Sequence, residues 1–200
     1  MVKLTIMKSN LNAIIGDLDS VTDTVRDFYA SQANPALVVH LVDQESTDFN
    51  KSVAWIRKEY PSGMDIVALG GLGGRVDQGI RQLHEIYLMQ KDPAYSSGRL
   101  YLLSGSSLTF LLKSGKHLIH VQEEGEKRVF AKHVGIIPLL EPSQITTKGL
   151  QWDVTDWATS MGGPMSTSNH ILPDTRCIEI ETTKDVLFTV ALFDAEEDER

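Results

Sequence analysis

Residues 66–78 read Ile-Val-Ala-Leu-Gly-Gly-Leu-Gly-Gly-Arg-Val-Asp-Gln, an apolar run followed by four glycines, an arginine and an aspartate. The apolar run predicts a buried strand, and the residues from Gln78 to Met89 have the apolar spacing of a helix. Backbone N–H groups of the glycine loop and of the helix start can face an anion, and Arg75 adds a guanidinium for phosphate oxygens. The loop lacks the lysine and serine or threonine of a Walker sequence. A purely structural glycine turn remains the alternative.

The same alternation of apolar runs and helical patterns extends outward to the start of the chain. Apolar runs at 13–15 and 36–41 precede helical patterns at 21–30 and 48–60, respectively. Alternating strands and helices predict a parallel sheet flanked by helices, an α/β/α arrangement.

An acidic stretch, Gly16-Asp17-Leu18-Asp19-Ser20, follows the first apolar run. Two carboxylates two residues apart, with a glycine that gives access, suit a hard cation that carries phosphate. The alternative is an acidic turn in which Ser20 or Asp19 caps the next helix.

A second acidic stretch, residues 43–51, follows the next predicted strand. Thr47 is expected to be the N-cap of the helix 48–60, whose spacing places Asp48 and Lys51 on one face. A carboxylate beside an ammonium can hold metal and phosphate in one place. The alternative is a solvated ion pair that contributes a few tenths of a kcal/mol.

All three stretches are predicted at the carboxyl edge of one sheet, where α/β proteins place their ligand sites. A metal–triphosphate site needs this mixture of acidic and basic groups around one crevice. The sequence therefore predicts phosphoryl chemistry by a set of six residues: Asp17, Asp19, Asp48, Asp77, Lys51 and Arg75.

The second half of the chain has a different pattern. After about residue 96, short apolar stretches alternate with turn residues and no strong helical period recurs. This pattern predicts a smaller all-β domain, a sandwich or a partly closed barrel. The polar segment 91–98 is the expected boundary, which gives an α/β domain over residues 1–95 and a β domain over residues 96–200.

Composition excludes several classes of protein. Apolar residues make up 42% of the 200 residues, enough for a real core, and the formal net charge of −8 argues against nonspecific binding to nucleic acid or to anionic membranes. No stretch approaches the roughly 20 apolar residues of a membrane span. The single cysteine, Cys177, lies in a predicted strand and fits a reducing compartment, so a cytoplasmic location is expected.

These motifs, in this order and spacing, resemble those of thiamine pyrophosphokinases of the eukaryotic, fungal-like type. The resemblance extends from about residue 11 to about residue 193. It rests on the three stretches above and on three in the β half: Gly135 to Pro138, Lys148-Gly-Leu-Gln-Trp-Asp-Val and Ser166-Thr-Ser-Asn169.

The resemblance implies a role for each matching residue. Asp17, Asp19, Asp48 and Asp77 are expected to bind Mg²⁺ and polyphosphate, with Lys51 and Arg75 neutralising phosphate charge. The backbone at Gly73 and Gly74 is expected to contact the nucleotide. Residues expected to contact thiamine are Gln44, Trp152, Ser168 and Asn169.

The implied reaction is attack by the thiamine hydroxyl on the β-phosphorus of ATP, giving thiamine diphosphate and AMP. Such a transfer depends on positioning and charge neutralisation, and Asp48 is a candidate base. Thiamine is a cation with flat rings, so the indole of Trp152 offers stacking and cation–π attraction. The resemblance also implies a homodimer in which the α/β domain of one subunit and the β domain of the other share each site.

The sequence departs from the family before Gly16. Members carry several dozen more residues there, including a first strand, so the α/β domain is expected to be truncated at its start. One alternative is therefore a non-catalytic isoform that binds thiamine or nucleotide, or dimerises, without turnover. Another is a different nucleotide-dependent transferase or hydrolase that uses the same carboxylates.

Overall fold

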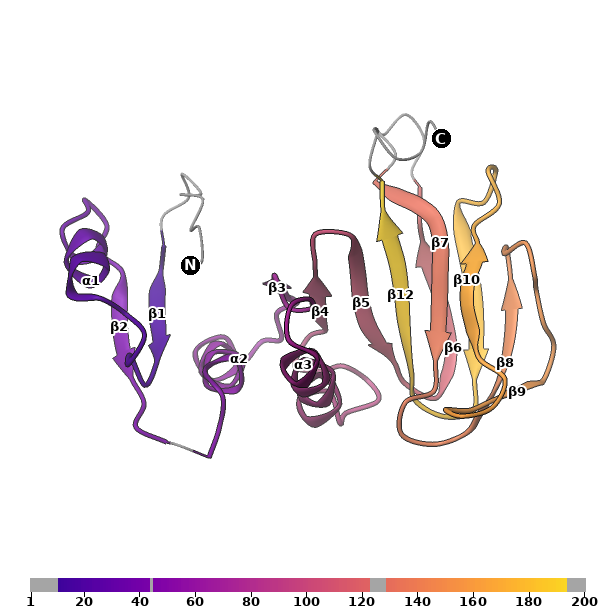
Figure 1. Ribbon diagram of the computed structural model, residues 1–200, viewed down its shortest axis with the longest axis horizontal. Coiled ribbons are helices and arrows are strands. Elements are labelled where there is room, and N and C mark those ends of the chain that lie inside the picture. The colour runs from indigo at the N-terminus through magenta and orange to yellow at the C-terminus, as the bar shows by residue number, and fades with distance from the viewer. Residues whose placement is uncertain (1–10, 44, 123–128, 194–200) are drawn as a thin grey trace. The chain divides into compact units, whose positions relative to one another are not determined.

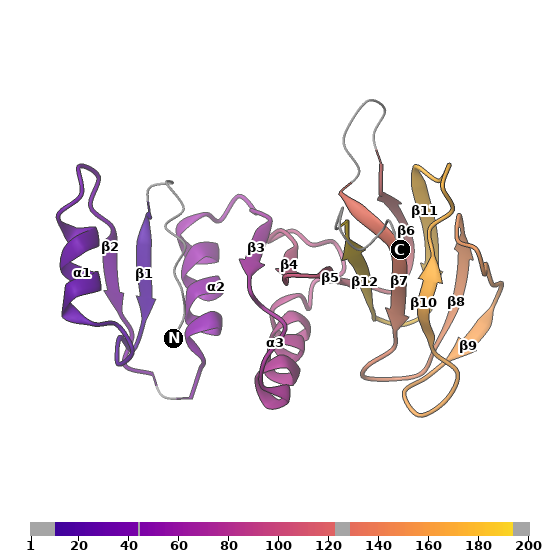
Figure 2. The same cartoon turned by 45° about the horizontal axis from the view of Figure 1, so that its top comes forward.

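The computed structural model describes residues 11–43, 45–122 and 129–193. The chain divides into two compact units, residues 1–61 (the N-terminal unit) and residues 62–200 (the C-terminal unit), which are described separately. Figures 1 and 2 together label the helices and strands of both.

The N-terminal unit is a strand–helix–strand–helix segment. Its two strands pair in parallel, from Ala13 opposite Leu37 to Gly16 opposite His40, and both arrows point the same way in Figure 2. Parallel strands need a crossover, which α1 provides. The elements are β1 (Ala13–Gly16), α1 (Asp23–Ala30), β2 (Leu37–His40) and α2 (Asp48–Glu59).

Side-chain caps set where both helices of this unit begin. Thr47 Oγ1 accepts a hydrogen bond from the backbone N–H of Asn50 (3.2 Å), which confirms the predicted cap of α2. The cap of α1 is Thr22, whose Oγ1 accepts from Val25, so the alternative of a cap at Asp19 or Ser20 is wrong.

The C-terminal unit contains one long helix and a two-sheet sandwich (Figures 1 and 2). A six-stranded sheet has the order β10-β7-β12-β5-β4-β3, and a four-stranded sheet has the order β6-β11-β8-β9. Its elements are β3 (Ile66–Leu69), α3 (Val76–Met89), β4 (Leu100–Leu103), β5 (Ser107–Leu112), β6 (Gly115–His120), β7 (Phe130–Ile137), β8 (Ser143–Lys148), β9 (Trp157–Thr159), β10 (Ser166–His170), β11 (Cys177–Thr182) and β12 (Val186–Leu192).

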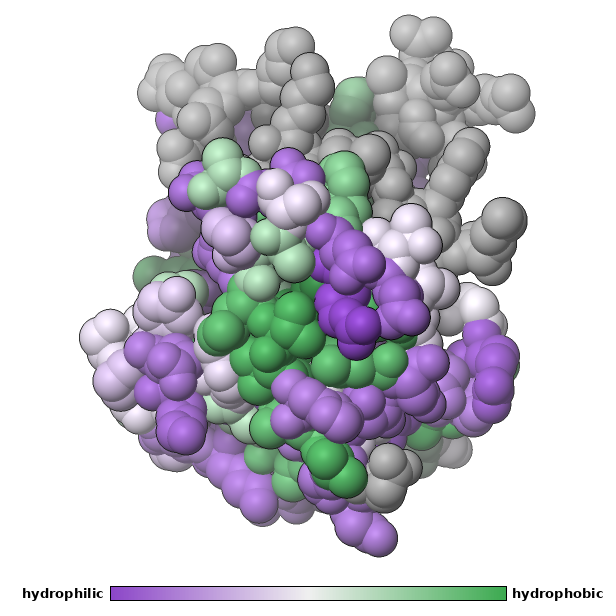
Figure 3. Space-filling model, turned by 90° about the vertical axis from the view of Figure 1, so that its left-hand side faces the viewer, coloured by the Kyte–Doolittle hydropathy of each residue, from purple (hydrophilic) through white to green (hydrophobic). Residues whose placement is uncertain are grey.

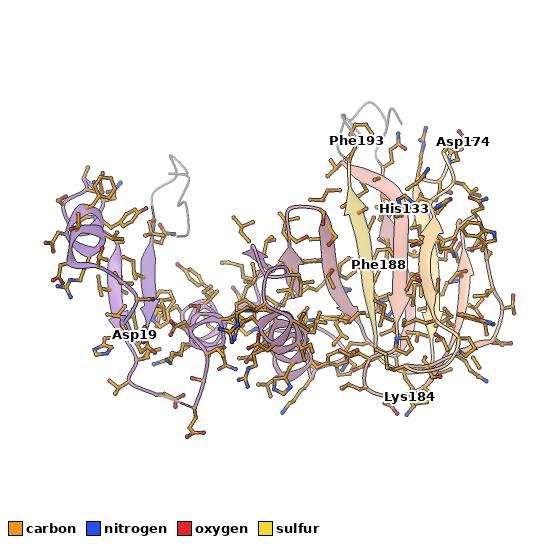
Figure 4. The ribbon with its side chains drawn as sticks, in the orientation of Figure 1. Asp19, His133, Asp174, Lys184, Phe188 and Phe193 are labelled. Carbon is orange, nitrogen blue, oxygen red and sulfur yellow. The ribbon has the colours of Figure 1, made fainter. Side chains whose placement is uncertain are left out.

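The main core fills the space between these two sheets. Phe188 of β12, labelled in Figure 4, is fully buried, and its ring lies 5.3 Å from that of Phe110. Ile178 and Ile180 of β11 face it from the other sheet and are also fully buried. Alternating inward apolar residues on both sheets are the pattern of a β-sandwich. The predicted fold class, a parallel α/β region followed by an all-β region, is confirmed.

Parallel pairing occurs twice, in different sheets. β1 pairs with β2, whereas β3 pairs in parallel with β4 inside the six-stranded sheet. In the part of the chain that the structure describes, the three motif-bearing strands therefore do not form the single sheet that the sequence predicts. Strand β3 precedes the domain boundary predicted between residues 95 and 96, and its partner β4 follows that boundary. The boundary itself stays a prediction.

The apolar pattern of the sequence did not predict strands β8, β9 and β10. These strands are short or polar, and β8 buries two hydroxyl residues, Ser143 and Thr147, beside Ile145. Of the helices in residues 11–43, 45–122 and 129–193, none has both the length and the apolar content to cross a membrane.

The N-terminal unit exposes a large share of its apolar residues. Figure 3 looks onto this unit and shows apolar side chains gathered in the middle of the face in view. Phe28 of α1 is 47% exposed, and Leu37 of β2 is 54% exposed. Among its described residues, only Ala36 and Val53 are buried apolar side chains. The core of this unit is therefore small.

Candidate active site

An aspartate–lysine cluster lies at the carboxyl ends of β1 and β2, where Figure 4 labels Asp19. Asp48, the first residue of α2, accepts at Oδ1 a hydrogen bond from the backbone N–H of Asp17 (3.2 Å). Lys51 Nζ lies 3.3 Å from Asp48 Oδ1 and 3.8 Å from Asp17 Oδ2. The Lys51 side chain is 3% exposed, so its ammonium is held beside both carboxylates. The structure thus brings together these residues from two of the predicted stretches.

Gly16 allows the Asp48 carboxylate to reach the end of β1. A Cβ atom at position 16 would lie 2.7 Å from Asp48 Oδ1, closer than real Cβ contacts. Any side chain at this position would therefore displace the carboxylate. This close approach is the physical reason for glycine in the stretch Gly16 to Ser20.

The two aspartates of this stretch have unequal affinities for protons. The backbone N–H of Asp19 donates to Asp17 Oδ1 (3.2 Å) and, with the charge of Lys51, lowers the pKa of Asp17 below its ordinary value. The nearby Asp17 carboxylate, and to a smaller degree that of Asp48, raises the pKa of Asp19. A cation placed here would relieve that repulsion.

A cavity of about 310 Å³ is lined by Lys51, a member of this cluster. A cavity of about 370 Å³ lies elsewhere, in the C-terminal unit. The lining of the smaller cavity includes two lysines, Lys51 and Lys58, together with Asn50 and Trp55. Its remaining lining residues are Leu41, Asp43, Ser46 and Ala54. Two ammonium groups, an amide and an aromatic ring suit an anionic ligand with a flat ring, such as a nucleotide.

The glycine loop lies in the C-terminal unit, between β3 and α3. Gly74 has a φ of 68°, a conformation that favours glycine. Arg75 is the N-cap of α3 and makes no side-chain capping bond, so the first backbone N–H groups of α3 have no such partner. Such a helix start suits an anion, as predicted.

Arg75 and Asp77 pair with each other. Arg75 Nε lies 3.1 Å from Asp77 Oδ1, and an Arg75 terminal nitrogen lies 2.6 Å from Asp77 Oδ2. This pairing lowers the pKa of Asp77. Both side chains are more than half exposed, and such surface pairs contribute about 0–1 kcal/mol. A phosphate group can therefore compete for Arg75.

Trp152 stands at a second pocket, of about 210 Å³, within the C-terminal unit. Its side chain is 54% exposed, which leaves one part of the indole open to a ligand. The other lining residues are Thr147, Val154, Trp157, Met165, Ser166, Thr167 and Asn169. This mixture of aromatic rings, a thioether and hydroxyl groups suits a flat organic cation.

Asn169 supports Trp152 through the backbone. Its Oδ1 accepts from the Trp152 N–H (3.2 Å), and its Nδ2 donates to the Trp152 carbonyl (2.9 Å). Asn169 is only 6% exposed, so its amide holds the loop rather than standing free for a ligand. Ser168 is exposed and has a φ of 56°, at an irregularity in the pairing of β10 with β7.

Asp153 holds the other end of this loop. Its carboxylate accepts from the backbone N–H groups of Gly149 (2.9 Å) and Leu150 (3.1 Å) and from Thr147 Oγ1 (2.9 Å). Gly149 has a φ of 99°, and a Cβ atom there would lie 3.1 Å from the carbonyl oxygen of Cys177. The stretch from Lys148 to Val154 thus encodes a fixed loop that presents Trp152.

Sequence reasoning missed several lining residues, notably Trp157, Met165 and Lys58. Trp157 and Met165 lie in segments without a strong period, and Lys58 follows Lys51 at two helical turns, the one signal that was available. Gln44, expected near thiamine, lies outside the described residues.

The carboxylates fit a metal that is shared with phosphate. Within the described ranges, no three His, Cys, Asp or Glu side chains are already grouped as ligands of one ion. Mg²⁺ keeps several waters and typically takes one or two carboxylates plus substrate phosphates. Asp17 and Asp48 both lie close to the Lys51 ammonium, so these two carboxylates are near each other. Asp17, Asp19 and Asp48 therefore suit a metal that arrives with polyphosphate.

Two domain families match the chain. The thiamin pyrophosphokinase catalytic domain matches residues 4–95, and the thiamin pyrophosphokinase vitamin B1 binding domain matches residues 116–187. Thiamine pyrophosphokinase 1 of Oryza sativa subsp. japonica is 33% identical over 192 residues, which cover 93% of this chain and 68% of that protein. The chain belongs to the thiamine pyrophosphokinase family.

Other relatives within the thiamine pyrophosphokinase family agree. Thiamine pyrophosphokinase 3 of Oryza sativa subsp. japonica is 34% identical over 187 residues, which cover 90% of this chain and 66% of that protein. The chain thus spans about two thirds of the length of these curated relatives. The crystal structure of yeast thiamin pyrophosphokinase superimposes with a TM-score of 0.78 at 28% identity, covering 93% of this chain and 71% of that one.

Proposed function

We propose that the chain transfers diphosphate from ATP to the hydroxyl group of thiamine, giving thiamine diphosphate and AMP. Family membership supports this reaction. Two pockets also support it. One contains lysines beside carboxylates and suits the phosphates of ATP, and the other contains Trp152 and suits the flat rings of thiamine.

The single observation that carries the proposal is the convergence of Asp17, Asp48 and Lys51 at the ends of two parallel strands. A polyphosphate needs cations, and the net charge of −8 means that they must be supplied locally. Lys51 is a buried, fixed cation, whereas Asp17 and Asp19 can accept a metal that carries the phosphates. Arg75 adds a second cation for phosphate oxygens.

In this reaction the protein mainly positions the two substrates and neutralises the charge of the phosphates. Bound Mg²⁺ would neutralise charge on the ATP phosphates, and Asp17, Asp19, Asp48 and Asp77 are the proposed ligands. Lys51 and Arg75 hold phosphate oxygens, and Gly73 and Gly74 leave backbone N–H groups near them. Asp48 is the proposed acceptor of the thiamine hydroxyl proton.

Trp152 is the proposed thiamine contact. Its open indole offers a flat, electron-rich face to the cationic ring system. Ser168 is exposed, and we retain it as a proposed polar contact to thiamine on the family resemblance. Gln44 is retained on the family resemblance.

We extend the proposal to a homodimer that shares its sites. The exposed apolar side chains of the N-terminal unit, such as Phe28 and Leu37, support an association surface. The cytoplasm, where ATP and Mg²⁺ are abundant, is the proposed location.

The test incubates the purified chain with ATP, Mg²⁺ and thiamine and quantifies AMP and thiamine diphosphate. Equal amounts of both products are expected from the native chain. Asp48→Asn is expected to lower turnover by about 100-fold or more, because it weakens metal and proton contacts at once. Asp23→Asn is the matched control, since Asp23 is an exposed aspartate of the same unit that pairs with Arg26.

Three outcomes separate the alternatives. Products from the native chain and from Asp23→Asn, but not from Asp48→Asn, support the transferase. A folded chain that binds thiamine but forms neither product supports the non-catalytic isoform. Release of ADP or of free phosphate, without thiamine diphosphate, supports a different nucleotide-dependent enzyme.

A further inference from the structure

The ring of His170 contacts two other aromatic rings, one of which, Trp152, lines the pocket proposed for thiamine. The Trp152 indole lies 5.0 Å from the ring of His170, at an angle of 49°. His170 also meets His133 edge to face, with ring centroids 4.9 Å apart and an angle of 79°. Trp152 lies on the loop after β8, His170 ends β10, and His133, labelled in Figure 4, lies on β7.

Hydrogen bonds fix the ring of His170, which contacts both of the others. Nδ1 of His170 lies 2.8 Å from Gln151 Oε1, and an amide oxygen can only accept, so Nδ1 carries a proton. The His170 backbone N–H donates to Asn169 Oδ1 (2.8 Å), and its carbonyl accepts from the Gln151 N–H (2.8 Å). His170 also pairs with His133 across the β10–β7 ladder. The ring therefore has one orientation, and its Nε2 is the nitrogen left to titrate.

An exposed tryptophan needs such support to serve as a stacking surface. The backbone of Trp152 is held by Asn169, but these bonds do not fix the plane of the indole. That plane depends on what the indole leans against, and the ring contact that the structure shows is with His170. Pre-ordering an aromatic face avoids the loss of side-chain freedom on binding.

We propose that His170 is a positioning residue that holds the Trp152 indole for a flat cationic ligand, and that protonation of His170 weakens the binding of that ligand. The inference rests on the proposed function, in which the ligand is thiamine. His170 itself acts through Trp152.

The charged groups around His170 determine the direction of the pH effect. From β7, the ring of His133 contacts it and the charge of Lys132 acts on it, and from the loop it meets Gln151 and Trp152, which carry no charge. Partial burial, then His133 and Lys132, lower the pKa of His170 below its ordinary value. A bound cation lowers it further, because like charges repel.

Proton linkage determines whether ligand affinity rises or falls as the pH changes. Above pH of about 7, His170 is neutral with and without ligand, so affinity does not depend on its titration. As the pH falls through the pKa of His170 in the free protein, the ligand must displace a proton to bind. Affinity therefore falls toward low pH, and the loss saturates only below the pKa of the complex.

The first experiment needs no ligand. Ring proton resonances of His170 are followed by NMR against pH in the native chain, in Trp152→Leu and in His120→Phe. Aromatic rings this close shift each other's resonances, so Trp152→Leu is expected to move the His170 signals. His120→Phe, which changes an exposed histidine of β6, should not move them. Unmoved His170 signals in a folded Trp152→Leu protein would overturn the positioning role.

The second experiment measures thiamine binding by calorimetry at pH 5.5 and 7.5. The native Kd is expected to be about threefold or more higher at the lower pH, and this difference should vanish in His170→Phe, which keeps a ring but cannot titrate. His170→Ala should weaken binding at both values. A native pH dependence retained in His170→Phe, or native affinity in His170→Ala, would contradict the proposal.

The two experiments separate this inference from the proposed function. If the native chain binds no thiamine at either pH while Trp152→Leu shifts the His170 resonances, the thiamine assignment fails and the ring support stands. If thiamine binds equally well to native protein and His170→Ala, the thiamine assignment stands and the positioning role of His170 fails.

Discussion

At the scale of single residues, the site depends on close approach. Gly16 lets the Asp48 carboxylate reach the end of β1, and Lys51 is buried beside it. The sequence showed these residue types and their spacing, and it correctly placed Asp48 and Lys51 on one face of a helix. It did not show that the Asp48 carboxylate accepts a hydrogen bond from the backbone N–H of Asp17, because that bond joins residues 31 positions apart.

Gly16→Ala is expected to lower turnover by about 10- to 100-fold and to strain the end of β1, where Gly16 has a φ of 159°. The new methyl group would displace the Asp48 carboxylate, and shifts of about 1 Å in a reacting group have effects of this size. Steady-state assays of AMP release and thiamine binding by calorimetry measure the two effects, and thiamine affinity should not change. Gly79→Ala, with nothing within 4 Å of its built Cβ atom, is the control. Full turnover in Gly16→Ala would contradict the role of Asp48.

Asn169→Asp is expected to weaken thiamine binding several-fold and to lower the free energy of unfolding by about 1–3 kcal/mol. A carboxylate keeps the acceptor for the Trp152 N–H but cannot donate to its carbonyl. Urea denaturation and calorimetry measure the two effects. If binding weakens with unchanged stability, Asn169 contacts the ligand directly, as the sequence predicted.

At the scale of helices and strands, local signals were reliable where the burial pattern was apolar. The three helices begin within about two residues of their predicted starts, and Thr47 is the cap that the sequence indicated. Strand β8 was missed because Ser143 and Thr147 are buried there. Ser143 Oγ meets Thr182 Oγ1 (2.8 Å), and Thr147 Oγ1 meets Asp153 Oδ1 (2.9 Å). Such burial is acceptable only once the partners are in place.

Thr47→Ala is expected to destabilise the N-terminal unit by about 1 kcal/mol and to lower turnover. The cap sets where α2 begins, and Asp48 is its first residue. Thr22→Ala removes the corresponding cap of α1, so it should lower stability with a smaller effect on turnover. Amide hydrogen exchange of α1 and α2, together with AMP assays, distinguishes the two variants. Equal losses of turnover would show that general destabilisation explains the effect.

At the scale of the whole molecule, the two units differ in core size. The described part of the N-terminal unit buries only Ala36 and Val53 among its apolar side chains, whereas the sandwich buries a continuous cluster around Phe188. Stability follows buried apolar area, so the units should differ in their free energies of opening.

Amides of β1 and β2 are therefore expected to exchange with solvent about 10-fold or more faster than those of β5 and β12. Hydrogen exchange with mass spectrometry at neutral pH measures this difference on the intact chain. Addition of ATP and Mg²⁺ should slow exchange in the N-terminal unit, because a ligand that binds only the folded form stabilises it. Equal protection of both units without ligand would contradict the expectation.

The sequence by itself determined the order of the helices and of the apolar strands, the α/β and all-β character of the two halves, and the residue types that suit phosphate and thiamine. Periodicity and capping are local properties, so they can be read from neighbouring positions. Only the tertiary structure decided that β3 joins the sandwich sheet, that Arg75 pairs with Asp77, and that His170 backs the Trp152 indole. Strand pairing, burial of polar groups and ring contacts depend on residues far apart in the chain, whose meeting is fixed by the packing of the whole fold.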